Sequence, residues 1–274
     1  MKSILLISLA GLIAGVVYAG QPQPPVIIYG QIRDEYGYPM DEGAEVAVID
    51  LTNDLNECGS YILDGAIHIG VNYSISVPLE DAKPFIRTNA TQQGTPAQVV
   101  VRVDGVDQPT VPAGTVTIPE PGGALKLDLS IAQDVDGDGL PDAWEELMVA
   151  WSGGIFSSIQ DINPDDDTDG DGMSNYKEYL AGTFPFLATD LFEITHSGRD
   201  SGSGRIALTF STVSTHKYHV LISGSLSEPE WNQAATALTV DGKIEYQVIN
   251  GTGREMTVYV DGDLSSAFFC IGAN

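Results

Sequence analysis

Basic residues are scarce in this sequence. Its 274 residues include 12 Lys and Arg against 38 Asp and Glu, which gives a formal net charge of −26 at pH 7. Nucleic acids and anionic membrane surfaces carry negative charge themselves, so they repel a chain of this composition. We therefore exclude nucleic acid as a partner and expect a soluble, exported protein.

Catalytic motifs are also missing. The sequence has no GxSxG, HExxH, P-loop or GxGxxG motif in a strand-to-helix context. We expect each of the four histidines to be an ordinary surface or half-buried residue; they are His68, His196, His216 and His219. Carboxylate pairs of the kind that cleave glycosides are the alternative, because acids are plentiful. Most of those acids belong to the pattern described below, so we predict that the protein is not an enzyme.

Cysteine is rare as well, with two residues, Cys58 and Cys270. One bridge over so long a span is not a disulfide framework. An exported protein can still pair two such residues. We expect them to be unpaired, with Cys270 in a core strand.

Long apolar runs are absent apart from one at the start of the chain. Lys2 precedes the apolar residues 4–17, and Val17-Tyr18-Ala19 places small residues at positions −3 and −1 of a cleavage site. This is the pattern of a signal peptide over residues 1–19. A retained anchor is the alternative, although the run is short for a membrane span. We predict a secreted or cell-surface protein with no membrane span in the mature chain.

Aspartate, in contrast, is concentrated in residues 134–178. This stretch holds thirteen acidic residues and one basic residue, Lys177, so it carries −12 of the net charge. Loop one (134–145, DVDGDGLPDAWE) and loop two (167–178, DTDGDGMSNYKE) place oxygen-bearing side chains at positions 1, 3, 5, 9 and 12, with glycine at position 6. Calcium-binding loops have this spacing. The predicted ligands are Asp134, Asp136, Asp138, the Leu140 carbonyl, Asp142 and Glu145 in loop one, and Asp167, Asp169, Asp171, the Met173 carbonyl, Asn175 and Glu178 in loop two.

The ligand set suits calcium, a hard cation that takes six to eight oxygens. Gly139 and Gly172 stand where each loop must turn sharply. Magnesium and manganese also accept all-oxygen sites, but many carboxylates favour calcium. A solvated acidic linker is the alternative, yet it would not repeat glycine and glutamate in register. We therefore predict two Ca²⁺ ions, and a helix after each loop that ends near Gly153 or Gly182.

The two loops resemble the calcium repeats of thrombospondin type 3 and of many secreted bacterial proteins, through the runs DVDGDGLPDAWEEL and DTDGDGMSNYKEYLAGTFP. The resemblance covers about residues 130–190. The loops are also EF-hand-like, but no helix is expected to enter them, because 125–129 alternates like a strand and Pro164 precedes loop two. Dockerins, which plug into cohesins, have duplicated calcium loops too. Ala143-Trp144 differs from their small polar recognition pair, which makes a dockerin-like assembly module a minor alternative.

Residues 25–129 are expected to form a β-sandwich. Residues 44–49 and 73–77 alternate between apolar and polar, as half-buried strands do, and turn residues separate them. The run GQIRDEYGYPMDEGAEVAV resembles the opening of carboxypeptidase regulatory-like domains of the prealbumin type. That resemblance covers about residues 30–80. It implies a seven-stranded sandwich with a structural or adhesive role and no catalytic residues.

Residues 190–274 are expected to form a second, smaller sandwich. Strand patterns include 206–210, 218–222 and 243–249, and Asp241-Gly242 is a hairpin signal. The fold class we predict is mostly β, with two antiparallel β-sandwich domains flanking a small helical double calcium-loop module at 130–189.

The function predicted from these observations is structural or surface-interacting, with calcium rigidifying the junction between two β domains. The alternative is a carbohydrate-binding or adhesion module whose partner is a cell-surface glycan or protein. Exposed aromatic residues on a sandwich face can bind sugars, and the candidates are Tyr29, Tyr36, Tyr38 and Trp231.

Overall fold

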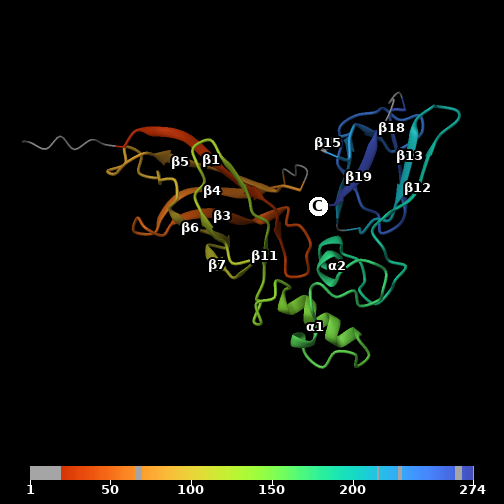
Figure 1. The fold of residues 1–274 in the computed structure, drawn as a ribbon, viewed down its shortest axis with the longest axis horizontal. Helices are drawn as coiled ribbons and strands as arrows, with labels where there is room; N and C mark the ends of the chain where they lie inside the picture. The colour runs from red at the N-terminus through yellow and green to blue at the C-terminus, as the bar shows by residue number, and fades with distance from the viewer. Residues whose placement is uncertain (1–19, 66–69, 215, 228–229, 263–266, 274) are drawn as a thin grey trace, which may run out of the picture.

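Among the residues that the structure describes, the chain is mostly β and its helices lie in the middle, as the sequence predicts (Figure 1). The computed structural model describes residues 20–65, 70–214, 216–227, 230–262 and 267–273. The predicted signal peptide at 1–19 and His68 lie outside these residues. None of the helices within the described ranges is both long and apolar enough to cross a bilayer.

The first β region, residues 22–131, contains sheets with the strand orders β10-β1-β5, β2-β11-β8 and β4-β3-β6-β7, and β9 also pairs with β6. Its strands are β1 (Pro22–Gly30), β2 (Ile32–Arg33), β3 (Glu42–Asp50), β4 (Asn56–Asp64), β5 (Tyr73–Glu80), β6 (Pro96–Val103), β7 (Val106–Gln108), β8 (Thr110–Val111), β9 (Thr115–Thr117), β10 (Ala124–Lys126) and β11 (Leu129–Ile131). Alternation along β5 turns Tyr73, Ile75 and Val77 into the core of this region and leaves the residues between them exposed.

Two strand pairs in this region are parallel, which departs from the expected antiparallel sandwich. β1 pairs with β10, and β2 pairs with β11, in the parallel sense. A parallel pair needs a long crossover connection, and here most of the region lies between the two partners. The segment 125–129, expected as one strand, is split between β10 and β11.

The second β region, residues 194–273, has the strand orders β12-β13-β18-β16 and β15-β14-β17, and β19 pairs with β14. Its strands are β12 (Ile194–Arg199), β13 (Ile206–Phe210), β14 (Lys217–Ser223), β15 (Asn232–Gln233), β16 (Thr236–Ala237), β17 (Ile249–Asn250), β18 (Met256–Val260) and β19 (Phe268–Ala273). Phe210, Tyr218 and Val258 lie at the centre of its core.

Three expectations for the second β region are corrected. The expected strand over 243–249 is reduced to β17 and an isolated bridge between Glu245 and Thr236, and the Gln247 side chain between them donates to the Thr236 carbonyl at 2.8 Å. Cys270 is exposed rather than in the core, because its neighbour Ile271 takes the inward position on β19; both cysteines are free, as expected. His216 and His219 are both fully buried, whereas each was expected to be a surface or half-buried residue.

The module between the β regions contains α1 (Asp142–Trp151), the 3₁₀ helix η1 (Ile159–Asp161) and α2 (Asn175–Ala181). The expected ends are close: α1 stops just before Gly153, and α2 ends at Gly182, which adopts the left-handed conformation with φ 71°. A small core of its own holds the module together; it consists of Leu140, Trp144, Met148, Ile162 and Tyr179.

One turn of the first β region meets the module at Tyr179. The Tyr179 hydroxyl lies 2.6 Å from the Ser130 hydroxyl, and it donates to the Asp34 carbonyl at 3.4 Å. Gly37 packs so closely that a Cβ there would lie 2.5 Å from the Tyr179 carbonyl oxygen, and its φ of 90° also requires glycine. The module is therefore docked on the turn formed by residues 34–41.

The same turn also reaches the second β region, so that three parts of the chain meet. Tyr38 makes an edge contact with His216, with ring centroids 5.6 Å apart. The Lys217 ammonium lies 2.7 Å from the Asp41 carboxylate. We call the meeting of turn 34–41, Tyr179 and His216 the three-way junction.

Replacing Tyr179 with Phe is expected to lower the free energy of unfolding by about 1 kcal/mol, because the buried Ser130 hydroxyl loses its partner. Urea unfolding followed by the fluorescence of Trp144, whose ring contacts Tyr179, measures this change. Tyr246→Phe is the matched control, because Tyr246 is 73% exposed. An equal change in both variants would contradict a role for the Tyr179 hydroxyl.

Candidate metal centre

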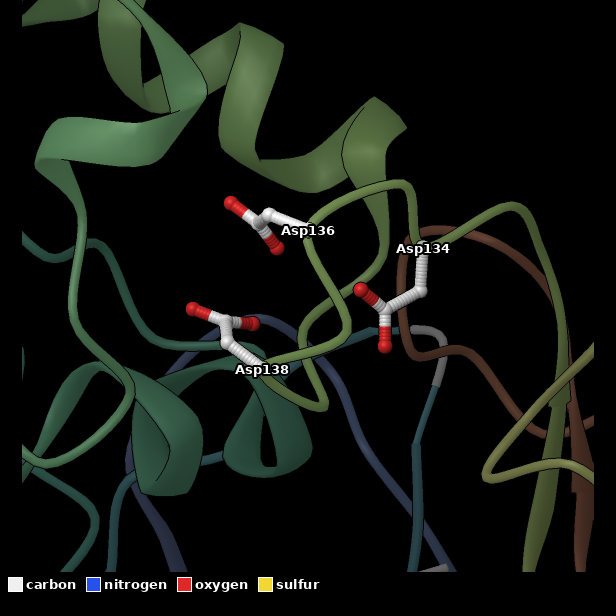
Figure 2. Close-up of side chains that lie close together, drawn as sticks. All are labelled: Asp134, Asp136 and Asp138. Atoms are coloured by element: carbon white, nitrogen blue, oxygen red, sulfur yellow. The ribbon is translucent and has the colours of Figure 1, made fainter.

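Loop one brings three aspartates together. Oxygens of Asp134, Asp136 and Asp138 lie within 4.8 Å of one another, and Figure 2 shows the three side chains around one turn of the loop. The Asp134 carboxylate accepts hydrogen bonds from the main-chain nitrogens of Gly137 at 2.7 Å and Gly139 at 3.1 Å. These bonds fix its orientation, and three like charges at such short range call for a cation.

Loop two repeats the arrangement. Oxygens of Asp167, Asp169 and Asp171 lie within 4.8 Å of one another. The Asp167 carboxylate accepts from the nitrogens of Gly170 at 2.7 Å and Gly172 at 2.9 Å. The two clusters are therefore built from corresponding positions and held by corresponding main-chain donors.

Glycine at position 6 of each loop has the conformation that the sharp turn requires. Gly139 has φ 100° and Gly172 has φ 101°. A side chain at this φ would be strained even where space is open. The expectation that glycine stands where each loop turns sharply is therefore confirmed in both loops.

Buried glutamates close both loops. Glu145 on α1 and Glu178 on α2 are 0% exposed. Among the described residues, both carboxylate oxygens of Glu145 and one of Glu178 have no hydrogen-bond partner. Burial, and then the nearby aspartates of the same loop, raise the pKa of each glutamate to about 8. An unpaired carboxylate is costly to bury, so these oxygens fit a calcium ion that would bind among them and the aspartates.

The side chains at position 9 brace the loops from within. Asp142 accepts from the Val135 nitrogen at 2.8 Å. Asn175 accepts from the Thr168 hydroxyl at 2.7 Å and donates to the Asn163 carbonyl at 2.8 Å. Calcium loops often use this position through a water, and its role as a ligand stays a prediction.

The residues expected to offer main-chain carbonyls are also held in place. The Leu140 nitrogen donates to Asp138 at 2.9 Å, and the Met173 nitrogen donates to Asp171 at 2.7 Å. Their roles as ligands stay predictions. An open cavity of about 610 Å³ beside Asp136 and Asp138 gives solvent access to loop one.

Sequence reasoning missed Thr183, whose hydroxyl donates to Glu178 Oε1 at 3.5 Å. Its place in the run AGTFP, directly after the helix of loop two, was the available signal.

The four aromatic residues considered for sugar binding do not form one cluster. Tyr36 and Tyr38 line one pocket, whereas Tyr29 is on β1 and Trp231 precedes β15 in the second β region.

Comparisons with known proteins agree with the geometry of the two loops. The family model of the bacterial TSP3 repeat matches residues 134–147 and 167–186. A search of curated proteins found no match for the chain. The repeat match and the aspartate clusters together indicate calcium binding.

Without calcium, the protein is expected to lose stability as pH rises from about 5 to about 8. The folded chain keeps protons on Glu145 and Glu178, whose pKa is raised to about 8, whereas the unfolded chain releases them near the ordinary value of 4.5. Their contribution is therefore full below the ordinary pKa and is lost as pH rises through the raised one. Melting temperatures of dialysed, calcium-free protein across this range measure the decline.

The double variant Glu145→Gln/Glu178→Gln is neutral at both positions at every pH. Its melting temperature should change less across the same range. A decline as steep as that of the original protein would show that other groups cause it.

Proposed function

We propose that this chain is a calcium-binding structural protein that holds two Ca²⁺ ions, one in each loop. The observation that supports this most is the repeated burial of a glutamate carboxylate, Glu145 or Glu178, beside three converging aspartates. The proposed ligands are those that the sequence predicts, from Asp134 to Glu145 and from Asp167 to Glu178. Binding would neutralise part of the −12 charge of this stretch.

We further propose that calcium rigidifies the connection between the two β regions. Each closing glutamate is followed or preceded by a core aromatic residue: Trp144 precedes Glu145, and Tyr179 follows Glu178. These two rings contact each other edge to face, with centroids 5.8 Å apart. Tyr179 also contacts Ser130 and Asp34. Calcium that fixes the two loops would therefore also fix the position of Tyr179 in the three-way junction.

The proposal places the protein outside the cell, where calcium modules have Kd values of about 10⁻⁴–10⁻³ M. It includes the signal peptide at 1–19, a structural or adhesive role for the carboxypeptidase regulatory-like first β region, and no enzymatic activity.

Calcium is expected to raise the melting temperature, and each loop is expected to account for one ion. At about 100 times Kd, one site stabilises a protein by about 2.7 kcal/mol. Asp138→Asn and Asp171→Asn should each remove one ion from a calorimetric calcium titration, because each takes a charge from one cluster. Asp165→Asn is the matched control: Asp165 is an exposed acid between the loops that belongs to neither aspartate cluster.

Two ions in the original protein and in Asp165→Asn, with one in each loop variant, is the expected pattern. An unchanged melting temperature in calcium and in EDTA would contradict the proposal. So would a loss of calcium in Asp165→Asn as large as in the loop variants.

Removal of calcium is expected to loosen the arrangement of the β regions, because the junction loses the support of the module. Small-angle X-ray scattering should show a larger radius of gyration in EDTA than in calcium. The Tyr179→Phe variant should show part of this increase with calcium present. If the calcium titration shows two ions but the radius of gyration does not depend on calcium, the rigidification proposal is wrong and the calcium-binding proposal stands.

A further inference from the structure

An aromatic pocket of about 310 Å³ lies where the first β region meets the module. Its lining includes Tyr36, Tyr38, Trp144, Leu147, Trp151 and Phe184. Trp151 and Phe184 are 50% and 37% exposed, and Tyr36 is 38% exposed, so their ring surfaces reach solvent. None of the contacts proposed for calcium uses this pocket.

The walls of the pocket are held in position by contacts behind them. Asp34 accepts hydrogen bonds from the nitrogens of Tyr36 at 3.0 Å and Tyr38 at 2.9 Å, which fixes the turn that carries both rings. On the opposite wall, Trp151 packs against Phe184 with ring centroids 5.2 Å apart. The pocket is therefore preformed, which reduces the entropy that a ligand must overcome.

The electrostatic surroundings of the pocket are negative. Asp34 and Glu35 directly precede Tyr36 in the turn, and Glu35, followed by Asp34 and Glu146, raises the pKa of Tyr36. The base that precedes this turn, Arg33, is buried and donates to the Gly37 carbonyl at 2.9 Å. Helix α1 ends at Trp151 with no basic residue in its last turn, so the negative end of its dipole also lies at the pocket. Of the described residues that line the pocket, none is basic.

We propose that this pocket binds a small quaternary ammonium compound, an organic cation of the trimethylammonium type. Aromatic faces attract cations through their quadrupoles, and such cages are a known means of binding quaternary ammonium groups. A primary ammonium carries three donors that must stay hydrogen-bonded. Among the described lining residues, the side-chain acceptors are the hydroxyls of Tyr36, Tyr38 and Thr183, and none is a carboxylate that could pair with an ammonium group. A quaternary ammonium group has no donor to lose, while the acidic surroundings complement its charge and disfavour an anion.

A titration with choline and its neutral isostere 3,3-dimethylbutan-1-ol tests the role of charge, because the two differ in charge and hardly in shape. Full-length protein in calcium should bind choline at least about tenfold more tightly, as followed by tryptophan fluorescence. N-acetyl-lysine amide and methyl glucoside, titrated alongside, should bind more weakly than choline. Equal binding of choline and the alcohol would overturn the proposal, as would tighter binding of either of the other two probes.

Variants locate the binding at this pocket. Tyr36→Ala removes one ring and should weaken choline binding by about 3- to 30-fold, and Glu35→Gln should weaken it less. The matched controls are Tyr246→Ala and Glu230→Gln, exposed residues of the second β region. Trp151→Leu serves as a second pocket variant if Tyr36→Ala lowers the melting temperature of the protein. Choline binding that is unchanged in both pocket variants would overturn the assignment to this site.

Discussion

The repulsion among crowded carboxylates is the constraint on which the middle of this protein depends. Each loop gathers three aspartates within 4.8 Å of one another and buries a glutamate beside them. The apolar core that supports both loops is small; its buried members are Leu140, Trp144, Met148, Ile162 and Tyr179. Such a core has little surface with which to offset buried charge. The charge state of the carboxylates, set by protons or by a divalent ion, therefore has a large influence on whether this part of the chain stays folded.

The β regions differ from the module in having larger apolar cores, and each core is made from residues of its own region. What they share with the module is the three-way junction. Its contacts are few and specific: the Tyr179 hydroxyl with Ser130, the ring of Tyr38 with His216, and the ion pair of Lys217 with Asp41. Contacts of this kind fix an orientation more than they add stability, since an exposed ion pair contributes about 0–1 kcal/mol. The module therefore contacts the first β region through a few specific side chains of this junction.

The features that sequence reasoning recovered are local ones. The acidic loops, the helices after them and strands such as β5 and β13 depend on spacing within about a dozen residues, and spacing is visible in a sequence. Contacts between distant segments were not recovered. Ser130 and Tyr179 carry no pattern that links them, and the burial of His216 depends on a turn about 180 residues earlier in the chain. Residues 243–249 alternate like a strand, but their main-chain pairing is limited to a bridge at Glu245 and the start of β17, and the Gln247 side chain bonds to Thr236 between them. The parallel pairs β1–β10 and β2–β11 also join strands that are far apart in the sequence, so no local pattern predicts them.

The connection between β11 and loop one has a mechanical consequence. Only Ala132 and Gln133 separate the end of the strand at Ile131 from Asp134. Both are tied by hydrogen bonds, since the Ala132 nitrogen donates to the Pro109 carbonyl at 3.1 Å and the Gln133 carbonyl accepts from the Asp142 nitrogen at 3.0 Å. No slack is left in this link to absorb a displacement. A displacement of β11 therefore shifts Asp134 as well, so the position of the first β region and the geometry of the aspartate loop are coupled through this link.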